Sequence, residues 1–231
     1  MRRVWGRIDG PLGAPPGGGL VESRGARVGV AVLAAVLVGF DFAAPFGFEP
    51  AWARSLPFVL ALPVYGLGWG WNAEALGLRL RPRQGWGWWV RVGLVLGGLV
   101  LVVVGVVGGI GLLVGVELPA PVVAPWREWV EWFRQACLQA PLVEEGTYRF
   151  VLCLPLLALL GRWPAILGSA VVFALLHVRY GVAAPDNFAG GFVFAWSYVA
   201  SGTLVVPILM HACGNLFVIG SQAVYAWWMG G

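Results

Sequence analysis

The chain has 231 residues, of which 59% are hydrophobic and 11% are charged, and its mean hydropathy is +0.81. A soluble domain needs about a quarter of its residues charged to solvate its surface, so lipid must be the solvent of this protein. The length allows about six to eight membrane spans of ~20 residues and leaves no room for a separate soluble domain. The formal net charge is +4, and every basic residue apart from the two histidines is an arginine. The sequence has no basic stretch interleaved with aromatic residues, so it does not indicate a nucleic-acid partner.

The N-terminal part is predicted to hold a tail and three spans. Residues 1–27 are basic and rich in proline and glycine, which predicts a flexible tail. The first apolar run, from residue 28 to about 44, is interrupted only by Asp41 near its far end, where we expect an interfacial residue. Two more runs follow at about 53–71 and 88–116, separated by the polar, arginine-rich loop 72–86.

Residues 117–138 alternate tryptophan with charged side chains, a pattern typical of the membrane interface. Together with the preceding spans this segment completes an N-terminal region, residues 28–138. Four further spans are predicted in a C-terminal helical core, residues 139–231, at about 139–160, 163–180, 187–202 and 203–228. The fold class is therefore all-α, a polytopic transmembrane bundle of about seven spans, with six to eight as the range.

Charge predicts the orientation of this bundle. Both strong arginine clusters, in the tail and in the loop 72–86, fall on one side when the N-terminus is placed inside. Since basic residues are retained on the cytoplasmic side, we expect a cytoplasmic N-terminus and an integral protein of the cell (inner) membrane.

Ionisable residues inside predicted spans gather after residue 140: Glu144, Glu145, Arg149, His177 and His211. Charged groups at membrane depth are costly and are functional hypotheses by default. Glu145 and Arg149 are four residues apart, with the acid first, which favours an ion pair on one helix. Glu144 is rotated by about 100° from Glu145, so it can face a different neighbour.

His211 and Asn215 are also four residues apart and present their polar ends on one helix face. A buried carboxylate beside an imidazole can deprotonate water, and a second imidazole with an amide can donate to the oxyanion formed when water attacks a peptide bond. No serine or cysteine stands in a matching nucleophile motif. Water attack is the simplest chemistry for these residues.

Three motifs carry a family resemblance: EExxxR at residues 144–149, FxxxH at 173–177 and HxxxN at 211–215. In this order, on three apolar segments, they resemble the CPBP (ABI) family of intramembrane proteases, which includes CAAX prenyl endopeptidases and bacterial relatives linked to bacteriocin maturation and sorting-tail processing. The family often reads EExxFRG, and here Tyr148 replaces the phenylalanine and Phe150 the glycine.

The resemblance implies a role for each motif residue. Glu144 corresponds to the catalytic base and His177 to its partner on the water, while His211 and Asn215 correspond to the oxyanion side. Glu145 and Arg149 correspond to supporting residues. The implied activity is cleavage of a membrane-anchored protein or peptide near its C-terminus, as in sorting-tail or CAAX-like processing, without a cofactor. The span count places Glu144 and His177 toward the non-cytoplasmic side.

Four alternatives remain open at this point. Two histidines and a glutamate can bind zinc with a water in the fourth position, which gives a metal-dependent version of the same peptidase. Glu144, Glu145 and Arg149 can form a purely structural ion-pair network. The bundle can also serve as a non-catalytic membrane binding or immunity module, or as a transporter or proton relay.

Overall fold

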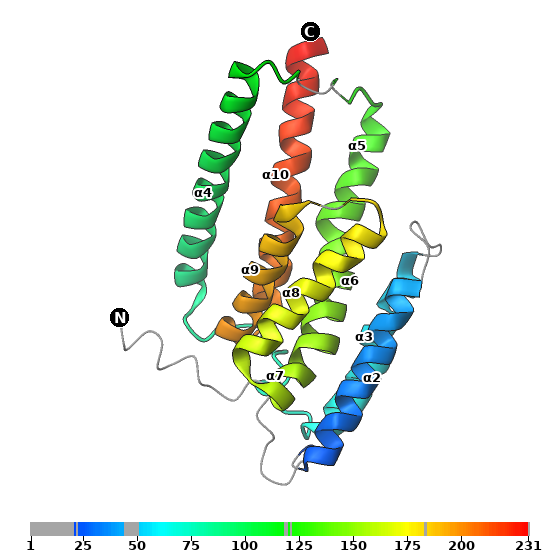
Figure 1. The fold of residues 1–231 in the computed structure, drawn as a ribbon. Helices are drawn as coiled ribbons and strands as arrows, with labels where there is room; N and C mark the ends of the chain where they lie inside the picture. Colours follow the sequence, from blue (N-terminus) through cyan, green and yellow to red (C-terminus); the bar gives the residue numbers. More distant parts are fainter. Residues whose placement is uncertain are drawn as a thin grey trace. The chain divides into compact units, whose positions relative to one another are not determined.

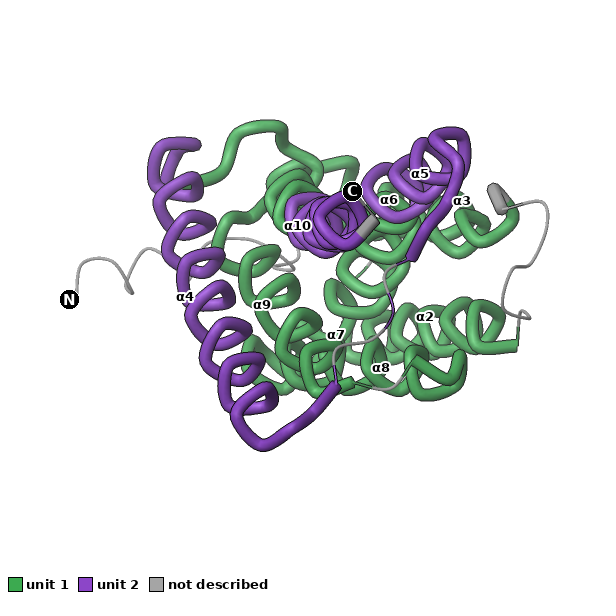
Figure 2. Tube along the Cα trace, turned by 90° about the horizontal axis from the view of Figure 1, so that it is seen from above, with its two compact units in different colours: residues 1–83, 140–211 green, residues 84–139, 212–231 purple. Residues whose placement is uncertain are grey.

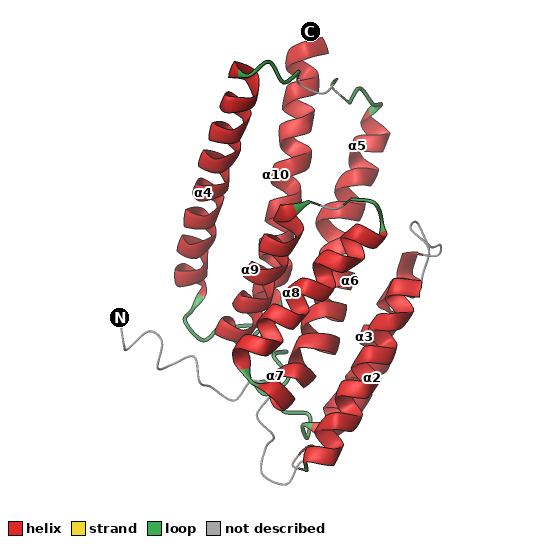
Figure 3. Cartoon of the chain, in the orientation of Figure 1, coloured by secondary structure: helices red, strands yellow, loops and turns green. Residues whose placement is uncertain are grey.

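The protein is helical throughout the part that its computed structural model describes, residues 21, 23–43, 51–117, 120, 122–182 and 184–230 (Figures 1 and 3). No strand occurs among these residues; Leu78 and Thr203 form an isolated antiparallel bridge. The all-α class predicted from the sequence is confirmed. Most of the predicted tail, residues 1–27, lies outside the described residues.

The described residues form two compact units that interleave along the chain (Figure 2). Unit 1 consists of residues 1–83 and 140–211, and unit 2 of residues 84–139 and 212–231. The three regions predicted from the sequence follow the chain in order, whereas each unit combines two separate stretches.

Unit 1 contains most of the helices, and glycines mark two of its turns. Gly161 and Gly202 have positive φ angles of 83° and 67° and separate successive helices, because a side chain would strain this backbone conformation. The elements of the unit are α2 (Arg24–Ala43), the 3-10 helix η2 (Ala51–Ser55), α3 (Leu56–Gly68), α6 (Ala140–Glu145), the π-helix η4 (Gly146–Cys153), α7 (Leu154–Leu160), α8 (Arg162–Arg179), α9 (Pro185–Ser201) and the first turns of α10 (Val205–Gly230).

Unit 2 contains α4 (Trp86–Leu113), α5 (Trp126–Phe133), the π-helix η3 (Arg134–Gln139) and the remainder of α10. Within the described residues, three helices are long and apolar enough to cross a membrane, namely α2, α4 and α10. Helices also occupy the other four predicted spans, with ends within a few residues of the predicted ones. The chain is an integral membrane protein with a helical membrane bundle.

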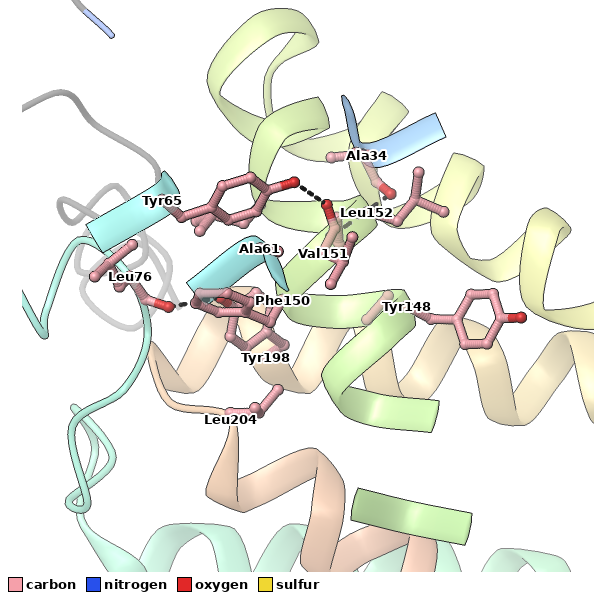
Figure 4. Close-up of a cluster of buried hydrophobic side chains, with 14 of the residues drawn as sticks. Ala34, Ala61, Tyr65, Leu76, Tyr148, Phe150, Val151, Leu152, Tyr198 and Leu204 are labelled. Carbon is pink, nitrogen blue, oxygen red and sulfur yellow. Dashed lines mark hydrogen bonds between the residues drawn. The ribbon is translucent and has the colours of Figure 1, made fainter. Parts of the chain in front are cut away.

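The π-helix η4 lies at the centre of unit 1, where it packs against α2, α3 and α6 to α9. All eight of its residues are buried. Figure 4 shows its neighbours: the Tyr65 hydroxyl donates to the Val151 carbonyl at 2.7 Å, and the Phe150 and Tyr65 rings lie 5.3 Å apart. A Cβ on Gly146 would lie 3.3 Å from the Phe58 ring, so glycine allows α3 to approach closely. The segment with the first motif is thus the core of the unit.

Candidate active site

The EEGTYR motif crosses the junction between α6 and η4. Its two glutamates end the α-helix, and Arg149 lies in the π-helical turn that follows. A π-helical turn inside an α-helix is rare and occurs frequently at functional sites, because it redirects side chains at a cost in backbone hydrogen bonding. The local backbone here therefore marks the motif independently of its residue types.

Glu145 and Arg149 form a fully buried ion pair. The Arg149 Nε donates to one Glu145 carboxylate oxygen at 2.7 Å, and both side chains have 0% exposure. A further nitrogen of Arg149 donates to the Ser169 hydroxyl at 2.8 Å, and that hydroxyl donates to the Tyr148 carbonyl at 2.9 Å. The pair expected from the four-residue spacing is present, and Ser169 joins it to α8.

His211 brings α10 to both glutamates. Its Nδ1 lies 2.9 Å from a Glu145 oxygen, and its Nε2 lies 4.0 Å from a Glu144 oxygen. The ring stacks on Phe194 of α9, with centroids 4.7 Å apart and an interplanar angle of 13°. The His211 and Glu144 side chains keep 8% and 11% exposure, whereas Glu145 has none. The accessible edge of the cluster thus belongs to Glu144 and His211.

His177 and His211 both lie beside the aromatic ring of Phe173. The His177 Nδ1 is 2.9 Å from the Phe173 carbonyl oxygen. Because a carbonyl can only accept, Nδ1 carries the hydrogen, and Nε2 keeps a lone pair in the neutral imidazole. The Phe173 ring centroid lies 4.6 Å from that of His177, 6.1 Å from that of His211 and 4.9 Å from the Arg149 guanidinium carbon. Phe173 therefore links the second motif to the other groups.

Asn215 lies in unit 2, one turn after His211 along α10. Its amide nitrogen donates to the Ala136 carbonyl of η3 at 2.6 Å. The structure thus brings Glu144, Glu145, Arg149 and His211 together in unit 1, places His177 beside Phe173, and gives the Asn215 amide a partner within unit 2.

A second buried network, which the sequence did not reveal, adjoins the motif helix. Asp41 of α2 has 1% exposure. Its two carboxylate oxygens accept from Arg54 at 3.0 and 3.4 Å, and one of them accepts from the Tyr148 hydroxyl at 2.7 Å. The Tyr180 hydroxyl donates to the Asp41 carbonyl at 3.3 Å. Asp41 is therefore a buried network centre and not simply an interfacial residue.

The first glutamate of the motif, Glu144, lies close enough to this second network for their charges to interact. The charge of Glu144 acts on Arg54, Tyr148 and Tyr180, and its carboxylate lies 4.0 Å from the His211 Nε2. Glu144 thus interacts with both polar assemblies. The only sequence signal for the second one is the isolated aspartate within an apolar run.

The described residues contain no group of three or more His, Cys, Asp or Glu side chains arranged to hold a metal ion. Glu144, Glu145 and His211 are the three such side chains of the cluster described above. Glu145 forms an ion pair with Arg149, and the His211 Nδ1 is hydrogen-bonded to Glu145, so these atoms already have partners within the protein.

These features define an integral membrane protein with a buried acid–imidazole cluster at the centre of a helical unit. Residues 125–217 match a family model described as type II CAAX prenyl endopeptidase Rce1-like. The match spans all three motifs and confirms the resemblance to the CPBP family over this part of the chain. The matched family is one of CAAX-type intramembrane endopeptidases, whose substrates are membrane-associated proteins. No curated protein and no solved structure matched the chain.

Proposed function

We propose that the chain is a glutamate-dependent, metal-free intramembrane endopeptidase that cleaves a membrane-anchored protein or peptide near its C-terminus. The observation that carries this proposal is the contact of His211 with Glu144 and Glu145, from segments 66 residues apart. A bundle needs no such convergence for packing, because burying ionisable groups costs free energy that apolar side chains would not.

Glu144 is the general base in this proposal. Its carboxylate takes a proton from a water whose oxygen then attacks the carbonyl carbon of the scissile bond. The lone pair on the His177 Nε2 accepts the other hydrogen of that water and orients it. When the tetrahedral intermediate collapses, the carbon–nitrogen bond breaks and Glu144 returns its proton to the leaving amine. The products are a new carboxyl terminus and a released amine.

His211 is the proposed oxyanion donor. With its imidazole protonated, the charges of Glu144, Glu145, Arg149 and His211 sum to zero, and the Nε2–H lies beside Glu144. Hydrogen bonds to a developing oxyanion are strong in a water-poor site. Glu145 and Arg149 hold the other ring nitrogen and so fix the orientation of the imidazole. Asn215 is proposed as the second donor on the basis of its motif.

The proposal also includes the side of the membrane on which cleavage occurs. The arginine-rich loop 72–83 and the α7–α8 turn lie at one end of unit 1 (Figure 1), and basic residues favour the cytoplasm. Arg54 and Tyr180, which interact with Glu144, belong to the ends of helices directed the other way. We therefore propose cleavage toward the non-cytoplasmic side, as for C-terminal sorting tails.

The test compares a deletion strain complemented with the wild-type chain or with Glu144→Gln, His177→Ala or His211→Ala. The C-termini of membrane proteins are mapped by mass spectrometry in each strain. We expect processing to fall by about 10²–10⁴-fold in the variants, the range for loss of a general acid–base group. Glu131→Gln, which removes an exposed carboxylate on α5, is the matched control and should retain processing. Full processing by Glu144→Gln at equal expression would refute the mechanism.

Metal dependence is tested separately on the purified chain in nanodiscs. We expect activity to persist in excess chelator, with no zinc by elemental analysis. Activity lost in chelator and restored by zinc would instead support the metal-dependent version.

A further inference from the structure

The loop between α3 and α4 is held in a defined conformation at the basic end of unit 1. The Leu204 amide donates to the Gly77 carbonyl at 2.8 Å, and the Tyr198 hydroxyl donates to the Leu76 carbonyl at 2.9 Å. The Thr203 hydroxyl donates to the Arg79 carbonyl. These bonds join the loop to the turn between α9 and α10, so the arginines that it carries are positioned in advance.

Arg83 ends this ordered loop in an unusual setting. Its amide donates to the Ser201 carbonyl at 3.0 Å. Its guanidinium lies against the backbone of Gly202, where a Cβ would come within 2.7 Å of the Arg83 Nε. Because Gly202 has no side chain, the guanidinium can lie against its backbone.

The guanidinium of Arg83 lacks hydrogen-bond acceptors within the described part of the chain. All three of its nitrogens are buried and unbonded there. The Glu74 carboxylate is 3.8 Å from Nε, too far for a hydrogen bond, and already accepts from Arg79 at 3.1 Å. Burial lowers the pKa of Arg83, and the charge of Arg79 lowers it further against the opposing effect of Glu74. Leaving five N–H donors of a buried cation without an acceptor is costly, and an anion with several acceptor oxygens would satisfy both the charge and the donors.

We propose that Arg83, assisted by the exposed Arg81, binds the phosphate group of an anionic phospholipid. A guanidinium donates two parallel hydrogen bonds to phosphate oxygens, a geometry that suits this ligand. The chain is an integral membrane protein, and Trp86, which is exposed, and Trp88, which is half-buried, follow the loop directly. Tryptophan is enriched at membrane–water interfaces. An arginine cluster beside such a belt lies at the depth of lipid headgroups.

Bound phosphate would strengthen unit 1 at the turn that precedes α10. The Arg83 amide is bonded to the last residue of α9, and the loop is bonded to Thr203 and Leu204, directly before the helix that carries His211. Anything that binds the folded state and not the unfolded state raises the melting temperature. Lipid binding is therefore measurable without any substrate and does not depend on the proposed peptidase activity.

The test measures the melting temperature of the purified full-length chain in a zwitterionic detergent. Three additions are compared: phosphatidylglycerol, phosphatidylcholine and inorganic phosphate. We expect phosphatidylglycerol to raise the melting temperature of the wild type, and we expect most of this rise to be lost in Arg83→Gln. Arg81→Gln, which changes an exposed side chain and leaves the fold intact, should show a smaller but clear reduction. Arg127→Gln, at an exposed arginine of α5, is the control and should respond as the wild type does.

The three additions separate the sources of the phosphate group. A rise with phosphatidylglycerol alone supports the lipid headgroup. A rise of the same size with inorganic phosphate, also removed by Arg83→Gln, would overturn the lipid assignment in favour of a soluble anion. Equal lipid responses in the wild type, Arg83→Gln and Arg81→Gln would overturn the site altogether.

Discussion

Arg149 is a charged side chain that is fully buried and yet has a partner for each nitrogen of its guanidinium. Its bonds to Glu145 and Ser169 tie the motif helix to α8. Replacing both partners of a buried ion pair with apolar residues is often tolerated. Removing only one partner is destabilising, because the other stays charged and buried. The structural role of this ion pair is thus compatible with a catalytic role for its neighbours.

Substituting Arg149→Met should therefore lower the free energy of unfolding by about 3–5 kcal/mol, the range for breaking a buried ion pair. The measurement is thermal unfolding of the purified chain in detergent. Arg134→Met provides the control, because Arg134 pairs with Glu131 three residues away on the same helix surface, but with exposures of 54% and 45%. Similar losses in both variants would show that the Glu145–Arg149 pair is not anchored in the core.

Tyr148 gives a physical reason for one departure from the family pattern. Its hydroxyl, absent from the phenylalanine that the family often has, donates to the buried Asp41 carboxylate at 2.7 Å. In the same way, Phe150 replaces glycine and fills the space beside Phe58, with ring centroids 5.0 Å apart. Both replacements secure the motif helix to the N-terminal helices of unit 1.

Tyr148→Phe should destabilise the chain by about 1.5–3 kcal/mol, as for a hydrogen bond to a charged group. Tyr180→Phe removes a longer bond to a neutral carbonyl and should cost only about 0.5–1.5 kcal/mol. Chemical denaturation of both variants in detergent measures the difference. An equal effect of the two substitutions would contradict the assignment of Asp41 as the centre of the network.

At the scale of elements, α8 and α9 approach closely through a glycine. A Cβ on Gly191 would lie 3.0 Å from a Phe173 ring carbon and 3.2 Å from the Ala170 carbonyl oxygen. Phe173 in turn contacts both histidines of the cluster. The spacing of these two helices therefore determines where the imidazoles lie.

Gly191→Ala should lower stability by about 1–3 kcal/mol, since overpacking forces side chains or backbone to shift, and it should reduce processing because Phe173 moves. In contrast, Gly29→Ala in α2 places its Cβ in open space and should be neutral or gain up to about 1 kcal/mol of helix propensity. Both are measured by thermal unfolding together with the C-terminal mapping described above. A Gly191→Ala variant with wild-type stability would show that the α8–α9 contact is loose.

Helix positions were predictable because apolar runs of spanning length leave few alternatives to a helix in lipid. The Glu145–Arg149 pair was predictable too, since it depends only on local spacing. The π-helical turn at η4 was not, because it depends on packing from six neighbouring elements. The partners of Asp41 were also hidden, since Arg54, Tyr148 and Tyr180 come from three different elements. The roles of Glu144, His177, His211 and Asn215 stay predictions.

At the scale of the whole molecule, the distribution of charge sets an orientation that labelling can test. α8 has 18 residues, which at 1.5 Å per residue is about 27 Å, close to the hydrocarbon thickness of ~30 Å. Its first residue, Arg162, belongs to the basic end of unit 1, so its last turn should reach the opposite side of the membrane.

We therefore expect a cysteine at position 178 to react with an impermeant reagent added outside the cell, and a cysteine at position 81 to react only after the membrane is opened. Val178 has 55% exposure and Arg81 is exposed, so both positions are accessible. The native Cys137, Cys153 and Cys213 are replaced beforehand, which also supplies the unlabelled control. Labelling of both positions from the same side would refute the predicted topology and the proposed side of cleavage.

The interleaving of the two units also constrains how the protein is made. Unit 1 is interrupted by residues 84–139, and its first segment is bonded to its last through Arg83 with Ser201 and Gly77 with Leu204. A ribosome that has inserted the N-terminal helices must still deliver nearly the whole chain before those bonds can close. Until then, the buried Asp41 and its partner Arg54 lack the hydrogen bonds that Tyr148 and Tyr180 donate to this network, so the polar network of unit 1 is completed only late in synthesis.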